Sequence, residues 1–258
     1  MPGTDDLALL VATAETAGAI ARRHFGKTPR VWQKAEGQGP VSQADLEIDE
    51  MLRDRLLRAR PGYGWLSEES AQEPGAAARG FIVDPIDGTR AFLDGQTGFA
   101  HALAVVEHGV PVAAVVHLPL RDLCYTAARG AGAWLNGAPI RVRSGARVAG
   151  AEVLVARPQL AAEHWPGGVP QVSRHFRPSL AWRMALVAEG RFDAMLALRP
   201  TWHWDIAAGA LLIAEAGGVV SDGCGSALRF DTDSPHSDGV IAAGPALHAE
   251  LMRLRLGV

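Results

Sequence analysis

One ten-residue stretch, FIVDPIDGTR at Phe81–Arg90, restricts the possible folds more than any other part of the chain. An apolar run leads directly into Asp84 and Asp87, with a proline between the two aspartates. Proline has no N–H for a central strand ladder and pushes the preceding residue toward extended geometry, so we expect the strand to stop and the chain to turn here. Asp87, Gly88 and Thr89 have the composition of a helix start, with Asp87 as the cap.

Such a turn would bring two carboxylates and several free amide N–H groups to one place. Carboxylate oxygens bind hard cations, and amides at a helix N-terminus bind phosphate. On these residues alone two interpretations stay open: a metal ion that bridges protein and phosphate, or a turn in which Asp84 and Asp87 are caps without any metal. Further carboxylates favour the metal. Glu68 and Glu69 follow a short apolar run, and Asp205 opens an Ala-rich helix where a buried charge needs a partner or a cation.

Composition and charge argue against several classes of protein. The chain has 258 residues, 48% apolar and 21% charged, with a formal net charge of −3. It therefore lacks the basic excess that binding a nucleic-acid polymer requires.

The two cysteines form no CxxC pair and fit a reducing cytoplasm. Asp5 and Asp6 stand where a signal peptide would be basic, and no run of about 18 apolar residues occurs, so we expect a cytoplasmic protein with no membrane segment.

Hydrophobic spacing predicts two packed lobes of mixed α+β and α/β class. The first part is expected to contain two helices, at 5–24 and 43–59, followed by an antiparallel meander of three apolar runs, at 99–106, 111–118 and 123–128. Beyond about residue 150 strands alternate with helices, which are expected at 179–189, 204–216 and 245–254. We therefore expect an N-terminal lobe over 1–150 with most metal ligands, and a C-terminal lobe over 151–258 that contributes Asp205 and substrate-binding residues.

Together these motifs resemble the inositol monophosphatase superfamily, a group of Mg²⁺-dependent, lithium-sensitive phosphomonoesterases. The resemblance rests on EES at 68–70, DPIDGT at 84–89 and WDIAAG at 204–209, which stand in the family's order and spacing. It continues through Lys34 and four further segments, PVSQAD at 40–45, GAWLNG at 132–137, LVAEG at 186–190 and EAGG at 215–218. It implies a layered αβαβα sandwich of the sugar phosphatase type, commonly a homodimer, that acts on a small phosphorylated metabolite.

The resemblance also implies two or three Mg²⁺ ions and a ligand set for each. One ion would be held by Glu68, Asp84 and the carbonyl of Ile86. A second would be held by Asp84, Asp87 and Asp205, and a third, looser ion would share Glu68. The third ion stays open because Gly39 stands where inositol-type members carry an Asp.

The remaining roles concern water and phosphate. Thr89, backed by Asp45, would orient and deprotonate the attacking water, and the amides of Gly88 and Thr89 would hold the phosphate. Two Mg²⁺ ions can stabilise the attacking and leaving oxygens of an in-line displacement, so no covalent intermediate is needed. Neighbours in a strand face opposite sides, so we expect only Glu68 to point toward Asp84, with Glu69 at the surface or supporting the ligands.

The leaving alcohol does not follow from the fold. The MLAL segment at 195–198 lacks a carboxylate that inositol-specific members carry, and PSL at 178–180 replaces their Gly-Ser/Thr-Ala, so both departures count against inositol. GPVSQAD at 39–45 and RPTWHWD at 199–205 resemble bacterial 3'(2'),5'-bisphosphate nucleotidases. We therefore favour 3'-phosphoadenosine 5'-phosphate, cleaved to AMP and phosphate, over inositol 1-phosphate and histidinol phosphate.

The expected substrate-binding residues are Lys34, Ser179 and Arg183. Arg183 stands where the nucleotidases carry a Lys and would meet a second phosphate, or else it pairs with a nearby carboxylate or extends to solvent. Trp202 or His203 would stack on a base or belong to the core. A catalytically silent, ligand-binding relative is the alternative of another class, and it would be expected to lose some of the acidic residues or the threonine that this chain keeps, Glu68, Asp84, Asp87, Thr89 and Asp205.

Overall fold

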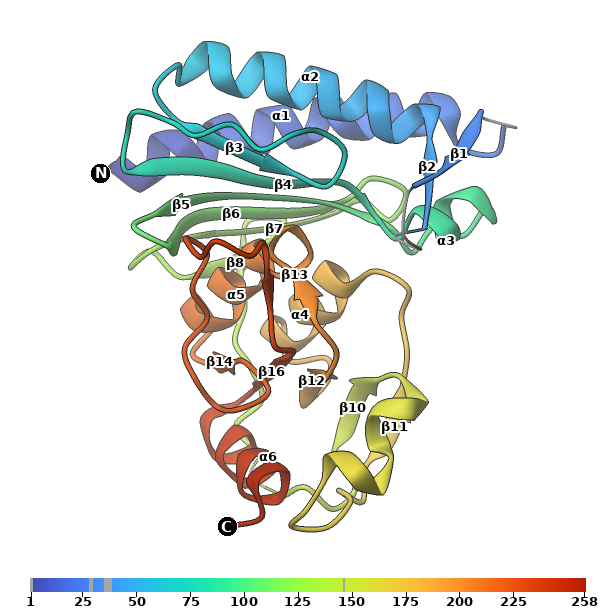
Figure 1. The fold of residues 1–258 in the computed structure, drawn as a ribbon, viewed down its shortest axis with the longest axis vertical. Coiled ribbons are helices and arrows are strands. Elements are labelled where there is room, and N and C mark those ends of the chain that lie inside the picture. The colour runs from blue at the N-terminus through green and yellow to red at the C-terminus, as the bar shows by residue number, and fades with distance from the viewer. Residues whose placement is uncertain (1, 28–29, 35–38, 146) are drawn as a thin grey trace.

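The computed structural model describes residues 2–27, 30–34, 39–145 and 147–258. Helices α1 (Pro2–His24) and α2 (Gln43–Ala59) cover one face of a seven-stranded sheet (Figure 1). Its strands follow chain order: β3 (Gly64–Ser67), β4 (Arg79–Asp87), β5 (Ala100–Glu107), β6 (Val110–Leu118), β7 (Leu123–Ala128), β8 (Ala133–Leu135) and β9 (Ala138–Pro139). Strands β3 and β4 are parallel and every later pair is antiparallel, which confirms the predicted meander.

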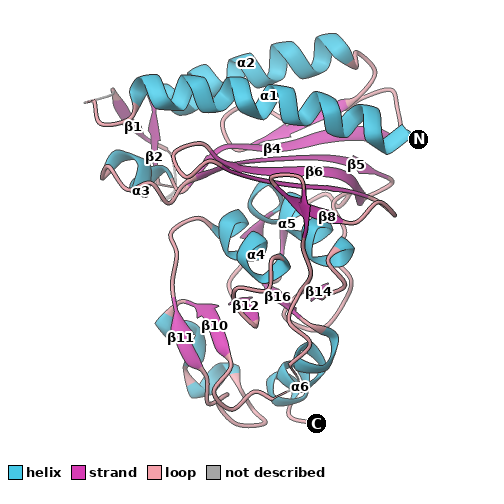
Figure 2. Cartoon of the chain, turned by 180° about the vertical axis from the view of Figure 1, so that it is seen from behind, coloured by secondary structure: helices cyan, strands magenta, loops and turns pink. Residues whose placement is uncertain are grey.

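Helices α4 (Leu180–Ala188) and α5 (His203–Glu215) lie between that sheet and a second, five-stranded sheet (Figure 2). The second sheet has the order β11 (Ser173–His175), β10 (Glu152–Val155), β12 (Ala194–Ala197), β16 (Val240–Ala243) and β14 (Val219–Ser221). Helix α6 (Pro245–Leu256) packs beyond it. The five layers form the αβαβα sandwich that the sequence predicts. Because both sides of α5 face other layers, it is apolar almost all round, with residues 206–213 all buried.

Shorter elements complete the fold. They are β1 (Val31–Gln33), β2 (Pro40–Ser42), α3 (Thr89–Leu93), β13 (Thr201–Trp202) and β15 (His236–Ser237), together with the 3-10 turns η2 (Arg157–Leu160) and η3 (Ala162–His164), which follow β10 beside the second sheet. Within the described residues, no helix combines the length and apolarity needed to cross a bilayer.

The prediction that the strand stops before Pro85 is wrong. Strand β4 continues to Asp87, and its register with β5 shifts: Asp84 lies opposite Ala102 and Asp87 opposite Ala100. Pro85 and Ile86 therefore both lie opposite His101, which is a β-bulge. A bulge accepts proline because the extra residue takes no place in the hydrogen-bonded ladder. The chain bends within the strand, and the two aspartates stand at the two ends of the bulge.

The prediction that Asp87 caps the next helix is also wrong. The N-cap of α3 is Gly88, which has no side chain to offer and adopts φ 101°. This left-handed region is costly for residues with a Cβ, so the position favours glycine. Asp87 is left with both carboxylate oxygens free for other partners.

Candidate metal centre and active site

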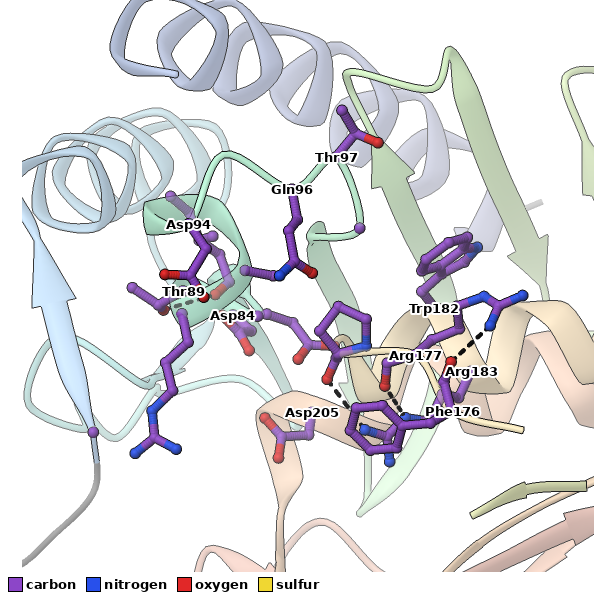
Figure 3. Close-up of a pocket in the computed structure, with 18 of the residues that line it drawn as sticks. Asp84, Thr89, Asp94, Gln96, Thr97, Phe176, Arg177, Trp182, Arg183 and Asp205 are labelled. Atoms are coloured by element: carbon purple, nitrogen blue, oxygen red, sulfur yellow. Dashed lines mark hydrogen bonds between the residues drawn. The ribbon is translucent and has the colours of Figure 1, made fainter. Parts of the chain in front are cut away.

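Three carboxylates converge beside the bulge of β4. Asp84, Asp87 and Asp205 each place one oxygen within 4.8 Å of the others. Asp84 and Asp87 are almost fully buried, and Asp205 lies in the first turn of α5. Figure 3 shows Asp84 and Asp205 on the same side of the cavity. Asp84 comes from β4 and Asp205 from α5. The structure thus gathers residues that are separated by more than a hundred positions in the sequence.

The electrostatics of this cluster call for a cation. Neither carboxylate oxygen of Asp84 has a hydrogen-bond partner among the described residues. Burial, and then the negative charges of the neighbouring carboxylates, raise the pKa values of Asp84 and Asp205 well above their ordinary range. A fold that holds acids in such a state needs protons or a metal to neutralise them. Oxygen-only donors of this kind fit Mg²⁺.

Asp87 is held from the other side by the start of α4. One of its oxygens accepts hydrogen bonds from Ser179 Oγ at 2.7 Å and from the N–H of Ala181 at 2.6 Å. The hydroxyl of Ser179, the N-cap of α4, also accepts from the N–H of Trp182 at 2.9 Å. Ser179, predicted to bind substrate, therefore lies against Asp87 with its hydroxyl engaged. These contacts use only one oxygen of Asp87 and restrict the rotation of its carboxylate.

Strand alternation does not explain how Glu68 and Glu69 lie, although of the two only Glu68 lines the cavity with Asp84. Strand β3 ends at Ser67, so the alternation of a strand does not apply to the two glutamates. Both reach the ammonium of Lys34, Glu68 at 2.6 Å and Glu69 at 2.8 Å. Glu69 is not a surface charge, because its side chain is 2% exposed, and burial raises its pKa to about 8.

Glu68 lines the same cavity as the three aspartates, although it is not one of the group within 4.8 Å. Its charge nevertheless raises the pKa of Asp84. Lys34, predicted to bind substrate, contacts both glutamates and is not among the residues that line this cavity.

Thr89 stands between Asp45 and the bulge. Its hydroxyl lies 3.1 Å from Asp45 Oδ1 and 3.1 Å from the carbonyl oxygen of Ile86. The other oxygen of Asp45 accepts hydrogen bonds from the N–H and the hydroxyl of Ser42. The Ser42 N–H bond and the bond from Asp45 N–H to Ser42 Oγ form the capping box of α2. Burial raises the pKa of Asp45 to about 6, against the opposing effect of these hydrogen bonds. The helix cap thus fixes the carboxylate that faces Thr89.

A cavity of about 1120 Å³ opens over these groups, and the sequence pointed to only part of its far side, namely Arg183 and Trp202. Figure 3 shows Phe176, Arg177, Trp182 and Arg183 gathered opposite Asp84 and Thr89. Trp182 lies between two guanidinium groups, with that of Arg121 4.6 Å and that of Arg177 5.7 Å from its ring centroid. The spacing of residues in the sequence could not predict the contact of Arg121 with Trp182 of α4, because this contact depends on how the layers of the fold pack.

The two aromatic candidates behave differently. Trp202 lines the cavity and stacks on Trp204, with ring centroids 4.7 Å apart and planes 9° apart. His236 stacks on the other side of Trp202, with ring centroids 5.0 Å apart. His203 is buried against Phe230 and does not line the cavity.

Comparison with known proteins agrees with this architecture. The model of the inositol monophosphatase family matches residues 4–256. The chain belongs to the inositol monophosphatase family. It is 37% identical over 240 residues to an inositol-1-monophosphatase of Rhizobium meliloti (strain 1021), covering 88% of this chain and 89% of that protein. It is 34% identical over 266 residues to a histidinol-phosphatase of Mycobacterium tuberculosis, covering 98% of this chain and 99% of that protein.

Solved structures give the same result for the fold. The extragenic suppressor protein SuhB of Bartonella henselae superposes with a TM-score of 0.84 at 30% identity, covering 98% of this chain and all of that one. Membership of the inositol monophosphatase family makes the chain a phosphoric monoester hydrolase. The named relatives act on different alcohols, so the family leaves the choice of ester open.

Proposed function

We propose that the protein is a Mg²⁺-dependent phosphomonoesterase that hydrolyses a small phosphorylated metabolite by direct attack of water. The observation that carries this proposal is Asp84, whose two buried oxygens have no hydrogen-bond partner among the described residues, while Asp87 and Asp205 each bring an oxygen within 4.8 Å. Asp84, Asp87, Asp205, Glu68 and the carbonyl of Ile86 would hold two to three ions. Bound there, Mg²⁺ would neutralise the phosphate and lower the pKa of a bound water.

The chain's own groups would position the reactants. In the proposed mechanism Thr89 passes its hydroxyl proton to Asp45, 3.1 Å away, and takes up the proton that the attacking water loses as its oxygen bonds to phosphorus. The capping box keeps Asp45 in place for this exchange. The amides of Gly88 and Thr89, at the start of α3, would donate to the phosphate oxygens. Ser179 and the N–H of Ala181 would fix the rotamer of Asp87.

Among possible esters we favour 3'-phosphoadenosine 5'-phosphate. The support is the resemblance of residues 39–45 and 199–205 to bacterial bisphosphate nucleotidases, together with Trp204, which lines the cavity and ends a stack with Trp202 that a base could extend. Inositol 1-phosphate and histidinol phosphate are the alternatives, and each corresponds to the name of a relative. We further propose lithium sensitivity, a homodimer and a cytoplasmic location, on the resemblance and the composition.

A substrate panel tests this proposal. The purified protein is assayed on 3'-phosphoadenosine 5'-phosphate, inositol 1-phosphate, histidinol phosphate and fructose 1,6-bisphosphate, with Mg²⁺ and with EDTA. We expect metal-dependent phosphate release, fastest from the nucleotide. Asp87→Asn should abolish turnover in a folded protein, while Asp54→Asn, an exposed aspartate of α2, serves as the matched control. Near-normal kcat in Asp87→Asn would contradict the assigned metal role.

The alternative of a silent ligand-binding relative makes a different prediction. Such a protein would take up a phosphorylated ligand without Mg²⁺ and would leave it intact. Calorimetry with and without Mg²⁺, followed by analysis of the ligand after incubation, separates the two. The proposed enzyme should show metal-dependent heat and consume the ligand.

A further inference from the structure

Helix α2 lies over the β3 edge of the large sheet and carries a row of polar side chains toward it (Figure 1). Asp45, Asp49 and Arg53 recur at intervals of four residues, so they lie on one face of the helix. Asp45 faces Thr89, and Arg53 donates to Glu73 at 2.8 Å. Asp49, between them, is 6% exposed and does not line the cavity. The proposed hydrolysis gives this buried acid no role.

One serine connects Asp49 to the residues that follow β3. Ser67, the last residue of that strand, donates its hydroxyl to Asp49 Oδ1. The same hydroxyl accepts a hydrogen bond from the N–H of Glu69 at 3.3 Å. Burial raises the pKa of Asp49, and hydrogen bonds from Ser67 and Ser70 oppose that rise. Because the Ser67 hydroxyl both donates and accepts, its orientation is fixed, and the main chain at Glu69 is tied to α2.

The segment that follows β3, residues 68–72, is here called the glutamate loop. It forms no helix or strand. Its base is closed by main-chain hydrogen bonds between Trp65 and Glu73, at 2.8 and 2.9 Å, and the ring N–H of Trp65 donates to Ser70 Oγ at 2.9 Å. Main-chain groups outside a ladder need other partners. Ser67 supplies that partner for Glu69, directly beside Glu68.

Glu68 and Asp84 follow paired positions of two neighbouring strands. Strands β3 and β4 are parallel, and Ser67 lies opposite Val83. The next residue along each strand direction is Glu68 in one case and Asp84 in the other. A displacement of Ser67 would therefore move Glu68 relative to Asp84.

We propose that Asp49 is a positioning residue for the metal centre, which holds Glu68 beside Asp84 through the hydroxyl of Ser67. The inference rests on the proposed metal site and extends it, because Asp49 lies outside the cavity and would bind no ion. Groups that orient a metal ligand change metal affinity by about 10- to 100-fold when they are removed. Asp49 would thus influence Mg²⁺ affinity without touching the ion or the ester.

Calorimetry with Mg²⁺ and no substrate tests this role directly. Asp49→Ala and Ser67→Ala each break the link and should bind Mg²⁺ about tenfold more weakly than the wild type. The Mg²⁺ concentration for half-maximal activity should rise by a similar factor, while KM for the ester changes little. Asp49→Asn keeps an oxygen that can accept the Ser67 hydroxyl, so it should recover most of the Mg²⁺ affinity. Unchanged affinity in both alanine variants overturns the inference.

Asp6→Ala is the matched control for lost stability. Asp6 is a buried acid of α1 that pairs with Arg60 and Arg79 at 2.9 Å, outside the cavity lining. We expect Asp6→Ala to lower the melting temperature while its Mg²⁺ affinity stays that of the wild type. Equal losses of Mg²⁺ affinity in Asp6→Ala and Asp49→Ala would mean that Asp49 acts only through general stability, which contradicts a positioning role.

A double-mutant comparison shows whether Asp49 acts through Glu68. Glu68→Ala should itself weaken Mg²⁺ binding. Asp49→Ala added to it should cause little further loss, because the residue that Asp49 positions is gone. A full additional tenfold loss would exclude this route. If Asp49→Ala fails to fold, Ser67→Ala takes its place in the same comparison.

These measurements separate the inference from the proposed hydrolysis. A wild type that binds Mg²⁺ and shows the losses above, but hydrolyses no ester, supports the role of Asp49 and contradicts the phosphatase activity. Turnover with unchanged Mg²⁺ affinity in both alanine variants does the reverse. A wild type that binds no Mg²⁺ overturns both.

Discussion

His101 of β5 donates its Nδ1–H to the main-chain carbonyl of Pro85 in β4. A carbonyl can only accept, so this contact fixes the tautomer of the ring. Pro85 and Ile86 are the two residues of the bulge opposite His101, and the interrupted ladder leaves a carbonyl there without a backbone donor. A side chain outside the DPIDGT motif therefore supports the bend that separates Asp84 from Asp87.

Removing this donor should weaken metal binding. In His101→Leu the buried carbonyl of Pro85 loses its partner, which costs about 1–3 kcal/mol of stability. The bulge then holds Asp84 and Asp87 less firmly, and the Mg²⁺ concentration for half-maximal activity and for half-maximal thermal stabilisation should rise about tenfold. His101→Asn keeps an N–H near the same position and should recover much of the Mg²⁺ response.

His117 provides the matched control. It lies opposite His101 in the β5–β6 pair, with ring centroids 6.0 Å apart, but it does not contact the bulge. His117→Leu should leave the Mg²⁺ response unchanged. Equal losses of Mg²⁺ affinity in the two leucine variants would show that His101 acts only through packing.

The same His117 variant tests a pH effect on stability. Burial, with a contribution from the charge of Arg22, lowers the pKa of His117 to about 4, from 6.5 in the unfolded chain, while Asp122 opposes the shift. Between these values the unfolded chain binds a proton that the folded one does not, so stability falls as pH falls from 6.5 to about 4. The full loss is about 3 kcal/mol. Urea unfolding should show His117→Leu gaining on the wild type across this window, and a pH-independent difference would contradict the assignment.

Asp205→Asn should change stability with opposite signs in the two metal states. Without metal, the substitution removes one of three converging acids, whose raised pKa values reflect their buried and mutually repelling charges. We expect the variant to melt above the wild type in EDTA by roughly 2–4 °C per kcal/mol of relieved repulsion. In saturating Mg²⁺ the order should reverse, because a ligand is missing. A lower melting temperature in both buffers would count against the cation site.

Ser179→Ala tests whether Ser179 acts through Asp87. The variant removes the 2.7 Å donor to Asp87 and the N-cap acceptor of α4, a loss of about 1 kcal/mol for the cap alone. We expect kcat to fall about tenfold and the Mg²⁺ requirement to rise, with little change in KM. A change confined to KM would instead return Ser179 to the substrate-binding role expected from the sequence.

Periodicity predicted the elements of the fold well because it reports burial directly, whereas the layered sandwich was predicted from the family resemblance. The apolar runs of the meander and the fully apolar α5 carry that signal within each segment. The path of β4 was mispredicted because proline is excluded from regular ladders but accepted at a bulge, and a bulge depends on the partner strand. His101, whose side chain donates a hydrogen bond to the Pro85 carbonyl of the bulge, has no local signature in the sequence.

The site was predicted unevenly for a related reason. Its acidic residues lie in short motifs, so their convergence could be anticipated, whereas contacts across the layers could not. Ser179 bonds Asp87 from 92 positions away, and Arg121 packs on Trp182 across the two halves. The pairing of Lys34 with both glutamates depends on where β3 ends, a boundary that sequence patterns locate poorly.

The opposed sides of the cavity come largely from different stretches of chain. Asp84 and Asp87 lie in β4 and Thr89 opens α3, whereas Phe176, Arg183 and Arg199 belong to residues 176–199. After gene duplication, substitutions in the later stretch can redirect such a protein to a new metabolite while its hydrolytic apparatus is inherited intact. Exchange of residues 176–199 between paralogues is accordingly the economical route to engineered selectivity in this scaffold.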